Sequence, residues 1–121
     1  MNKRVLVIED HEENRRILRY LLASASIEML EAVTGEEGVA MAEKERPDLI
    51  LMDIQLPGLD GYEATRRIKG NPALRHVPII VVTSYALSGD DVKAFEAGCD
   101  AYVTKPFVPR ELLAKVKEFL A

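Results

Sequence analysis

A small set of chemically capable side chains stands directly after short apolar runs in this sequence. VLVI (5–8) and LILM (49–52) are each followed at once by acids, and IIVV (79–82) by two hydroxyl residues. AYV (101–103) is followed by a threonine, a lysine and a proline. The candidate functional residues are therefore Glu9, Asp10, Asp53, Thr83, Ser84 and Lys105.

Three carboxylates held close together repel one another and need a neutralising charge. Lys105 supplies one positive charge, and a hard divalent cation would supply the rest. Carboxylates, a backbone carbonyl and waters describe an octahedral Mg²⁺ site that keeps open positions for phosphate oxygens. The lysine and the Thr83 hydroxyl would then be further contacts for the same phosphate.

This chemistry suits phosphoryl transfer, in which catalysis is mostly positioning and neutralisation of oxygens. The sequence has two histidines, His11 and His76, and one cysteine, Cys99, and we find no Ser-His-Asp or Cys-His arrangement among them. A carboxylate can itself act as the nucleophile and form an aspartyl-phosphate. Asp53 is the candidate, because it ends a central apolar run and a tight loop follows it.

The elements that must position these groups alternate along the chain. A fifth apolar run, 27–33, completes the set, and the segments between runs have helical periodicity. In 13–25, for example, Ile17, Leu18, Leu21, Leu22 and Ala25 fall on one face. Strict alternation predicts an α/β fold, a doubly wound five-stranded parallel sheet with five helices. The run 27–33 itself alternates apolar and polar residues, which predicts an edge strand.

Ligands of such sheets bind beyond the carboxyl ends of the strands, so the candidate residues should meet at one edge. Local signals agree with these elements. Thr34 with Glu37, and Ser88 with Asp91, resemble capping boxes at helix starts. Pro109 suits the first turn of a last helix, and Gly98 suits a left-handed helix end.

The bulk composition limits the classes of function. With 121 residues, 48% of them hydrophobic, the chain suits a single domain over 1–121. A net charge of −4 with mixed signs argues against a nucleic-acid surface. Arg15, Arg16 and Arg19 lie beside Glu12 and Glu13, which indicates a solvated helix face. No signal peptide or membrane span is evident, and the single cysteine suits a reducing compartment, so we expect a soluble cytoplasmic protein.

"VLVIED", "LILMDIQLPGLDG", "IIVVTS" and "AYVTKPF", in this order and spacing, resemble the receiver domain of bacterial two-component response regulators. The resemblance covers essentially the whole chain, and four motifs in register are highly specific. It implies the flavodoxin-like strand order 2-1-3-4-5. The chain is expected to be either a stand-alone regulator, similar to the chemotaxis and cell-division regulators, or an N-terminal receiver cut from a longer protein.

The resemblance also implies a role for each position. Asp53 matches the phosphoryl acceptor, Asp10 the direct Mg²⁺ ligand and Glu9 an acid acting mainly through water. The backbone carbonyl of Gln55 would complete the protein ligands. The remaining matches are Lys105 as the phosphate-binding lysine, Thr83 as the switch hydroxyl, Tyr102 as the switch aromatic, Ser84 as a small residue that leaves access to the phosphate, and a cis bond between Lys105 and Pro106.

Four positions carry less specific expectations. Asn14 often appears at this distance from the acid pair, with a less certain role. His11 stands where the family often has asparagine. Gln55 and Tyr85 flank the path of the hydrolytic water in the family, and a bulky Tyr85 is expected to slow loss of the phosphoryl group.

The function so implied is a phosphorylation-dependent switch that is not a turnover enzyme. A histidine kinase or histidine phosphotransfer protein would donate the phosphoryl group, and a downstream target protein would read it. We expect a monomer or a weak phosphorylation-dependent dimer. One alternative is a haloacid-dehalogenase-type phosphatase, but its second Asp is replaced by Gln55. Another is a phosphorylation-independent pseudo-receiver, against which the intact acids, Thr83 and Lys105 argue.

Overall fold

The computed structural model describes residues 2–84 and 90–121, which form five strands and five helices in strict alternation. The strands are β1 (Arg4–Ile8), β2 (Glu28–Ala32), β3 (Leu49–Met52), β4 (Ile79–Thr83) and β5 (Ala101–Thr104). The helices are α1 (Glu12–Ser24), α2 (Gly35–Glu45), α3 (Gly61–Gly70), α4 (Asp90–Ala97) and α5 (Pro109–Leu120). All strand pairings are parallel, in the order β2-β1-β3-β4-β5. The predicted flavodoxin-like fold is confirmed, with β2 at an edge.

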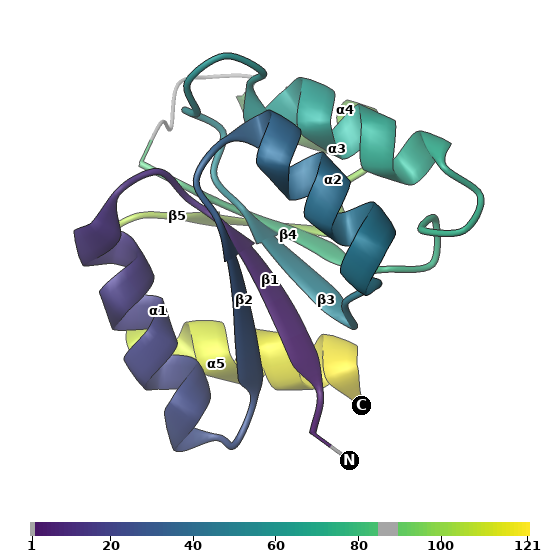
Figure 1. Cartoon of the computed structure of the whole chain (residues 1–121). Coiled ribbons are helices and arrows are strands. Elements are labelled where there is room, and N and C mark those ends of the chain that lie inside the picture. The colour runs from purple at the N-terminus through teal and green to yellow at the C-terminus, as the bar shows by residue number, and fades with distance from the viewer. Residues whose placement is uncertain (1, 85–89) are drawn as a thin grey trace.

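The helices cover both faces of the sheet (Figure 1). Helices α1 and α5 lie on one face, and α2, α3 and α4 lie on the other. The two termini lie near each other at the amino end of the sheet, away from the strand ends that carry the candidate residues. Strands covered on both faces must be apolar throughout, and β1, β3 and β4 are accordingly almost completely buried.

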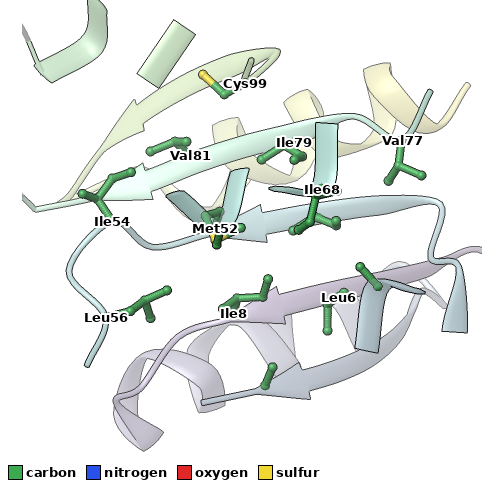
Figure 2. Packing of buried hydrophobic residues seen from close by; sticks show 14 of the residues in the cluster. Leu6, Ile8, Met52, Ile54, Leu56, Ile68, Val77, Ile79, Val81 and Cys99 are labelled. Carbon is green, nitrogen blue, oxygen red and sulfur yellow. The ribbon is translucent and has the colours of Figure 1, made fainter. Parts of the chain in front are cut away.

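The sheet divides the interior into two hydrophobic clusters. One contains Leu6, Ile8, Ile50 and Met52 with side chains of α2, α3 and α4, and Figure 2 shows its packing. The other lies against α1 and α5 and includes the alternate residues of the same strands. Alternate residues of a strand point to opposite faces, so two layers of helices can be held by one sheet. Cys99 is buried in the first cluster, as a small apolar residue would be.

Several local signals had the predicted structural effect. The Thr34 hydroxyl accepts a hydrogen bond from the Glu37 N–H at 3.1 Å and caps α2. Pro109 is the first residue of α5, and Gly98 has a φ of 110° directly after α4. Ser88 and Tyr85, to which a cap and a screening role were assigned, lie outside the described residues.

Helix α1 departs from its predicted pattern at one position. Leu18 and Leu22 are buried as expected, but Ile17 is 51% exposed and the neighbouring Tyr20 is 82% exposed. Only part of the predicted apolar stripe of α1 is therefore covered by the rest of the protein. Within the described residues, no helix is long and apolar enough to cross a membrane.

Candidate functional site

Strand pairing places the two central acids side by side. Ile8 of β1 is paired with Met52 of β3, and Glu9 and Asp53 are the next residues of these two neighbouring strands. The Asp53 N–H donates to the Ile8 carbonyl at 3.0 Å, which continues the ladder to the strand end. The predicted meeting of these acids at the carboxyl edge therefore follows from the register.

Lys105 reaches the same point from the far edge strand. Its N–H donates to the Thr83 carbonyl at 2.8 Å, and the Lys105–Pro106 peptide bond is cis, the isomer that the resemblance implied. Its ammonium group donates to Glu9 Oε1 at 2.8 Å and lies 3.8 Å from Asp53 Oδ2. We call Glu9, Asp10, Asp53 and Lys105 the acidic pocket.

The pKa values of the two central carboxylates are shifted in opposite directions. Glu9 and Asp53 are 3% and 7% exposed. Burial raises the pKa of Asp53 to about 6, with the negative charge of Glu9 adding to the rise and Lys105 opposing it. Burial also acts to raise the pKa of Glu9, but the hydrogen bonds from Lys105 and the His11 N–H outweigh it and lower that pKa to about 2. Glu9 thus carries the stable negative charge, and Asp53 holds the less favourable one.

The third acid, Asp10, has an unsatisfied oxygen. Its Oδ1 atom is buried and has no hydrogen-bond partner among the described residues. His11 Nδ1 lies 3.2 Å from it, but not in hydrogen-bonding geometry. A buried acceptor without a partner is costly unless a cation or water satisfies it. The pocket holds three carboxylates and one ammonium group, which contacts two of them. These carboxylates, with the free Asp10 oxygen, fit the hard oxygen donors that Mg²⁺ requires.

The loop from β3 to α3 is folded tightly around Asp53. The Gln55 N–H donates to Asp53 Oδ1 at 3.3 Å, and the Gly61 N–H donates to the Ile54 carbonyl at 2.9 Å. A Cβ atom at Gly61 would lie 2.2 Å from the Asp53 carbonyl oxygen, so only glycine fits at this start of α3. Asp60 caps the helix by accepting from the Glu63 N–H at 2.9 Å.

The remaining predicted residues surround the pocket at different depths. Thr83 ends β4 and is completely buried, whereas Ser84 is exposed. Tyr102 is half-buried and packs against the cluster on the α2–α3–α4 face, while Val103 packs on the opposite face. Tyr102 and Val103 therefore point to opposite faces of the sheet. Gln55 has an exposed side chain, which leaves its backbone as the group nearest the pocket.

Contacts around Glu9 add three residues whose roles the sequence left weak or missed. Asn14 Nδ2 donates to Glu9 Oε1 at 3.2 Å, and His11 Nδ1 lies 3.3 Å from Glu9 Oε2. Arg15 donates to the Glu9 carbonyl at 2.9 Å, and its side chain is only 12% exposed. The interpretation of Arg15 as part of a solvated face was therefore wrong. Its position in the first turn after the acid pair was the available signal.

The whole chain matches a known family. Residues 5–117 match the model of the response regulator receiver domain. The chain is 39% identical to the polar-differentiation response regulator DivK of Brucella anthropi over 120 residues, which cover 99% of this chain and 98% of the relative. This chain belongs to the response regulator receiver domain family.

Solved structures agree with this assignment. The receiver domain of the sensor histidine kinase PA1611 from Pseudomonas aeruginosa superposes with a TM-score of 0.92, with 37% identity and coverage of 99% of this chain and 98% of that one. A magnesium ion is coordinated in the active-site cleft of that structure. A CheY-like receiver domain from Methanospirillum hungatei gives a TM-score of 0.90, with 36% identity and coverage of 99% and 94%.

The family settles the class of molecule. Receiver domains are modules of two-component signalling and are not turnover enzymes, and they bind Mg²⁺ in the active site. The acidic pocket, with its unsatisfied Asp10 oxygen, is consistent with such an ion.

Proposed function

We propose that this protein is a phosphorylation-dependent switch that accepts a phosphoryl group on Asp53. The observation that carries the proposal is the position of this carboxylate. It is buried at the end of a central strand, with Lys105 3.8 Å away and Glu9 raising its pKa. A carboxylate held in this way is a nucleophile beside groups that can neutralise an incoming phosphate.

In the proposed reaction an Asp53 oxygen forms a bond to phosphorus while the bond from phosphorus to the donor's imidazole nitrogen breaks. The electron pair of the broken bond stays on the imidazole. Lys105, now bound to Glu9, is close enough to move toward the new phosphate oxygens. Glu9, Asp10, Asp53 and the Gln55 carbonyl would hold Mg²⁺, which neutralises charge on the phosphoryl oxygens when bound.

The proposed phosphoryl donor is a histidine kinase or a histidine phosphotransfer protein. An open hollow of about 460 Å³ lies beside the pocket and is shared by Lys105 with Ile17, Phe107 and Pro109. Ile17 and Tyr20 are exposed on the same helix. A largely apolar surface next to the nucleophile supports docking of a protein that presents a phosphohistidine, because a small-molecule donor would not need it.

The proposed readout passes through Thr83 and Tyr102 to the surface formed by α4, β5 and α5. The phosphate adds about −1.5 to −2 charge, by analogy with other phospho-residues, and offers oxygens to the Thr83 hydroxyl. An inward shift of Thr83 would open space that the Tyr102 ring can enter. Charges on this surface are mixed, which suits a downstream target protein better than nucleic acid. Phosphorylation would shift the population between two packings.

Labelling with acetyl phosphate and Mg²⁺ tests the acceptor. We expect one acid-stable, base-labile phosphoryl group per chain, lost in Asp53→Asn and kept in Asp91→Asn, which removes an exposed acid of α4. Labelling of Asp53→Asn, or labelling without a divalent ion, would contradict the proposal.

Amide NMR of a separate sample, with beryllofluoride as the phosphoryl mimic, tests the readout. Shift changes should extend from the pocket across residues 83 to 115 in the wild type. Thr83→Ala should accept phosphate but transmit these changes much more weakly. Undiminished transmission in Thr83→Ala would contradict the coupling while leaving Asp53 as the acceptor.

A further inference from the structure

The His11 side chain lies next to the acidic pocket, and the proposed phosphoryl chemistry does not use it. It immediately follows the acid pair in the chain and precedes α1. Its ring atom Nδ1 lies 3.2 Å from Asp10 Oδ1 and 3.3 Å from Glu9 Oε2. One ligand atom from each of these three residues lies within 4.8 Å of the other two.

These separations suit neighbouring ligands of a single small cation. In a six-coordinate site with bonds of about 2.1 Å, adjacent donor atoms are about 3 Å apart. The Asp10 oxygen nearest the ring is buried and makes no hydrogen bond, to His11 or to any other described residue. An acceptor without a partner, a carboxylate oxygen and a ring nitrogen thus face a common point.

We propose that His11 is an additional metal ligand, which makes this pocket a site for borderline transition-metal ions such as Zn²⁺ as well as for Mg²⁺. The proposal rests on the proposed function, because the ion occupies the pocket that serves Asp53. Imidazole nitrogen favours Zn²⁺, Ni²⁺ and Cu²⁺, whereas carboxylate and carbonyl oxygens alone favour Mg²⁺. Asparagine at this position would offer no such nitrogen.

The consequence is a pocket in which two classes of ion compete. Zn²⁺ would use the ring nitrogen with the Glu9 and Asp10 oxygens, while Mg²⁺ would depend on the oxygen donors. Lys105 and Asn14 both face Glu9 Oε1, so Oε2 is the Glu9 oxygen directed toward the ring. Loss of the ring should therefore weaken Zn²⁺ binding and leave Mg²⁺ binding almost unchanged.

The test uses the intact chain and the two metals alone. Calorimetric titration should show that His11→Asn lowers Zn²⁺ affinity by about tenfold or more and Mg²⁺ affinity by less than about twofold. The matched control is His76→Asn, which removes the other histidine, in the loop before β4, and should alter neither affinity. Nitrogen NMR of the wild type should show Zn²⁺ shifting the His11 Nδ1 resonance.

A Zn²⁺ response confined to His76, or an equal loss of both affinities in His11→Asn, would overturn the proposal. Acetyl phosphate labelling of the same samples in Mg²⁺ separates the two hypotheses. If Asp53 is still labelled while His11 does not respond to Zn²⁺, only the role of His11 fails. If His11 binds Zn²⁺ while labelling never occurs, the phosphoryl function fails and the metal site stands.

Discussion

Two clusters of charged side chains lie next to each other in this protein, and they are balanced differently. In the first, Arg15 and Arg19 of α1 bind Glu12 of the same helix and Glu31 of β2, with distances from 2.6 to 3.2 Å. We call this the α1–β2 network. Two guanidinium groups there face two carboxylates. In the acidic pocket, the one ammonium group contacts the carboxylates of Glu9 and Asp53, and a third carboxylate, that of Asp10, lies beside Glu9.

The pKa shifts follow this difference. The hydrogen bond from Arg19 is the main cause that lowers the pKa of Glu31, so its charge is stabilised where it stands. Burial and the charge of Glu9 raise the pKa of Asp53 instead. Charged residues that satisfy one another hold an edge strand to a helix. Buried carboxylates that lack enough positive partners are stabilised when a cation binds beside them, so such clusters favour ligand binding.

Replacing one acid in each cluster should give the largest difference between them. Asp10→Asn should reduce Mg²⁺ affinity by about 100-fold, because a direct charged ligand is lost. Glu31→Gln should change that affinity far less and should destabilise the protein, because two arginines lose a partner. Mg²⁺ titrations followed by NMR, with thermal unfolding of the same samples, measure both effects. Similar losses of Mg²⁺ affinity in the two variants would mean that the clusters are not separate.

The pH dependence of the free energy of unfolding should show the unfavourable charge of Asp53. Its pKa is about 6 in the folded protein against an ordinary value of 3.8, so the folded state binds more protons between these values. Without metal, stability should therefore fall as pH rises through this window, and Asp53→Asn should gain about 2 kcal/mol at pH 7. The gain should disappear as pH approaches 4. Urea unfolding of both proteins from pH 4.5 to 7 measures this difference in stability, and a gain that shrinks as pH rises would contradict the prediction.

The smallest expected effect concerns Arg15, which touches both clusters. Arg15→Ala should lower Mg²⁺ affinity by about threefold to tenfold, because Arg15 fixes the Glu9 carbonyl that precedes Asp10. Arg19→Ala is the matched control, since Arg19 shares Glu12 and Glu31 but, within the described part of the chain, forms no ion pair with the pocket. Equal affinities in the two variants would limit Arg15 to a structural role, which thermal unfolding would register separately.

The sequence predicted the fold and the acidic pocket because both follow from the backbone. Short apolar runs specify strands, and parallel strands bring the residues after them to one edge. Asp53, Glu9 and Lys105 could therefore be placed together without coordinates. Their distances could not, and neither could the preference of Lys105 for Glu9 at 2.8 Å over Asp53 at 3.8 Å.

The residues that were misjudged depend on side-chain direction instead. Arg15 lies in a run of charges that suggests a solvated face, yet its long side chain folds back to the Glu9 carbonyl. Ile17 fits the apolar stripe of α1 by spacing, yet it is half exposed and lines the open hollow beside Lys105. Periodicity gives the angle at which a residue leaves a helix and does not show whether a neighbouring element covers that residue.

The sheet divides the interior so that the two residues at the centre of β5 belong to different compartments. Tyr102 belongs to the cluster under α2, α3 and α4, and Val103 belongs to the one under α1 and α5. A rearrangement of the Tyr102 ring would disturb packing in the first compartment directly, and it would reach α5, on the other face, only through β5. The α1 surface that we propose meets the donor can thus keep one shape while the proposed reporting surface takes two.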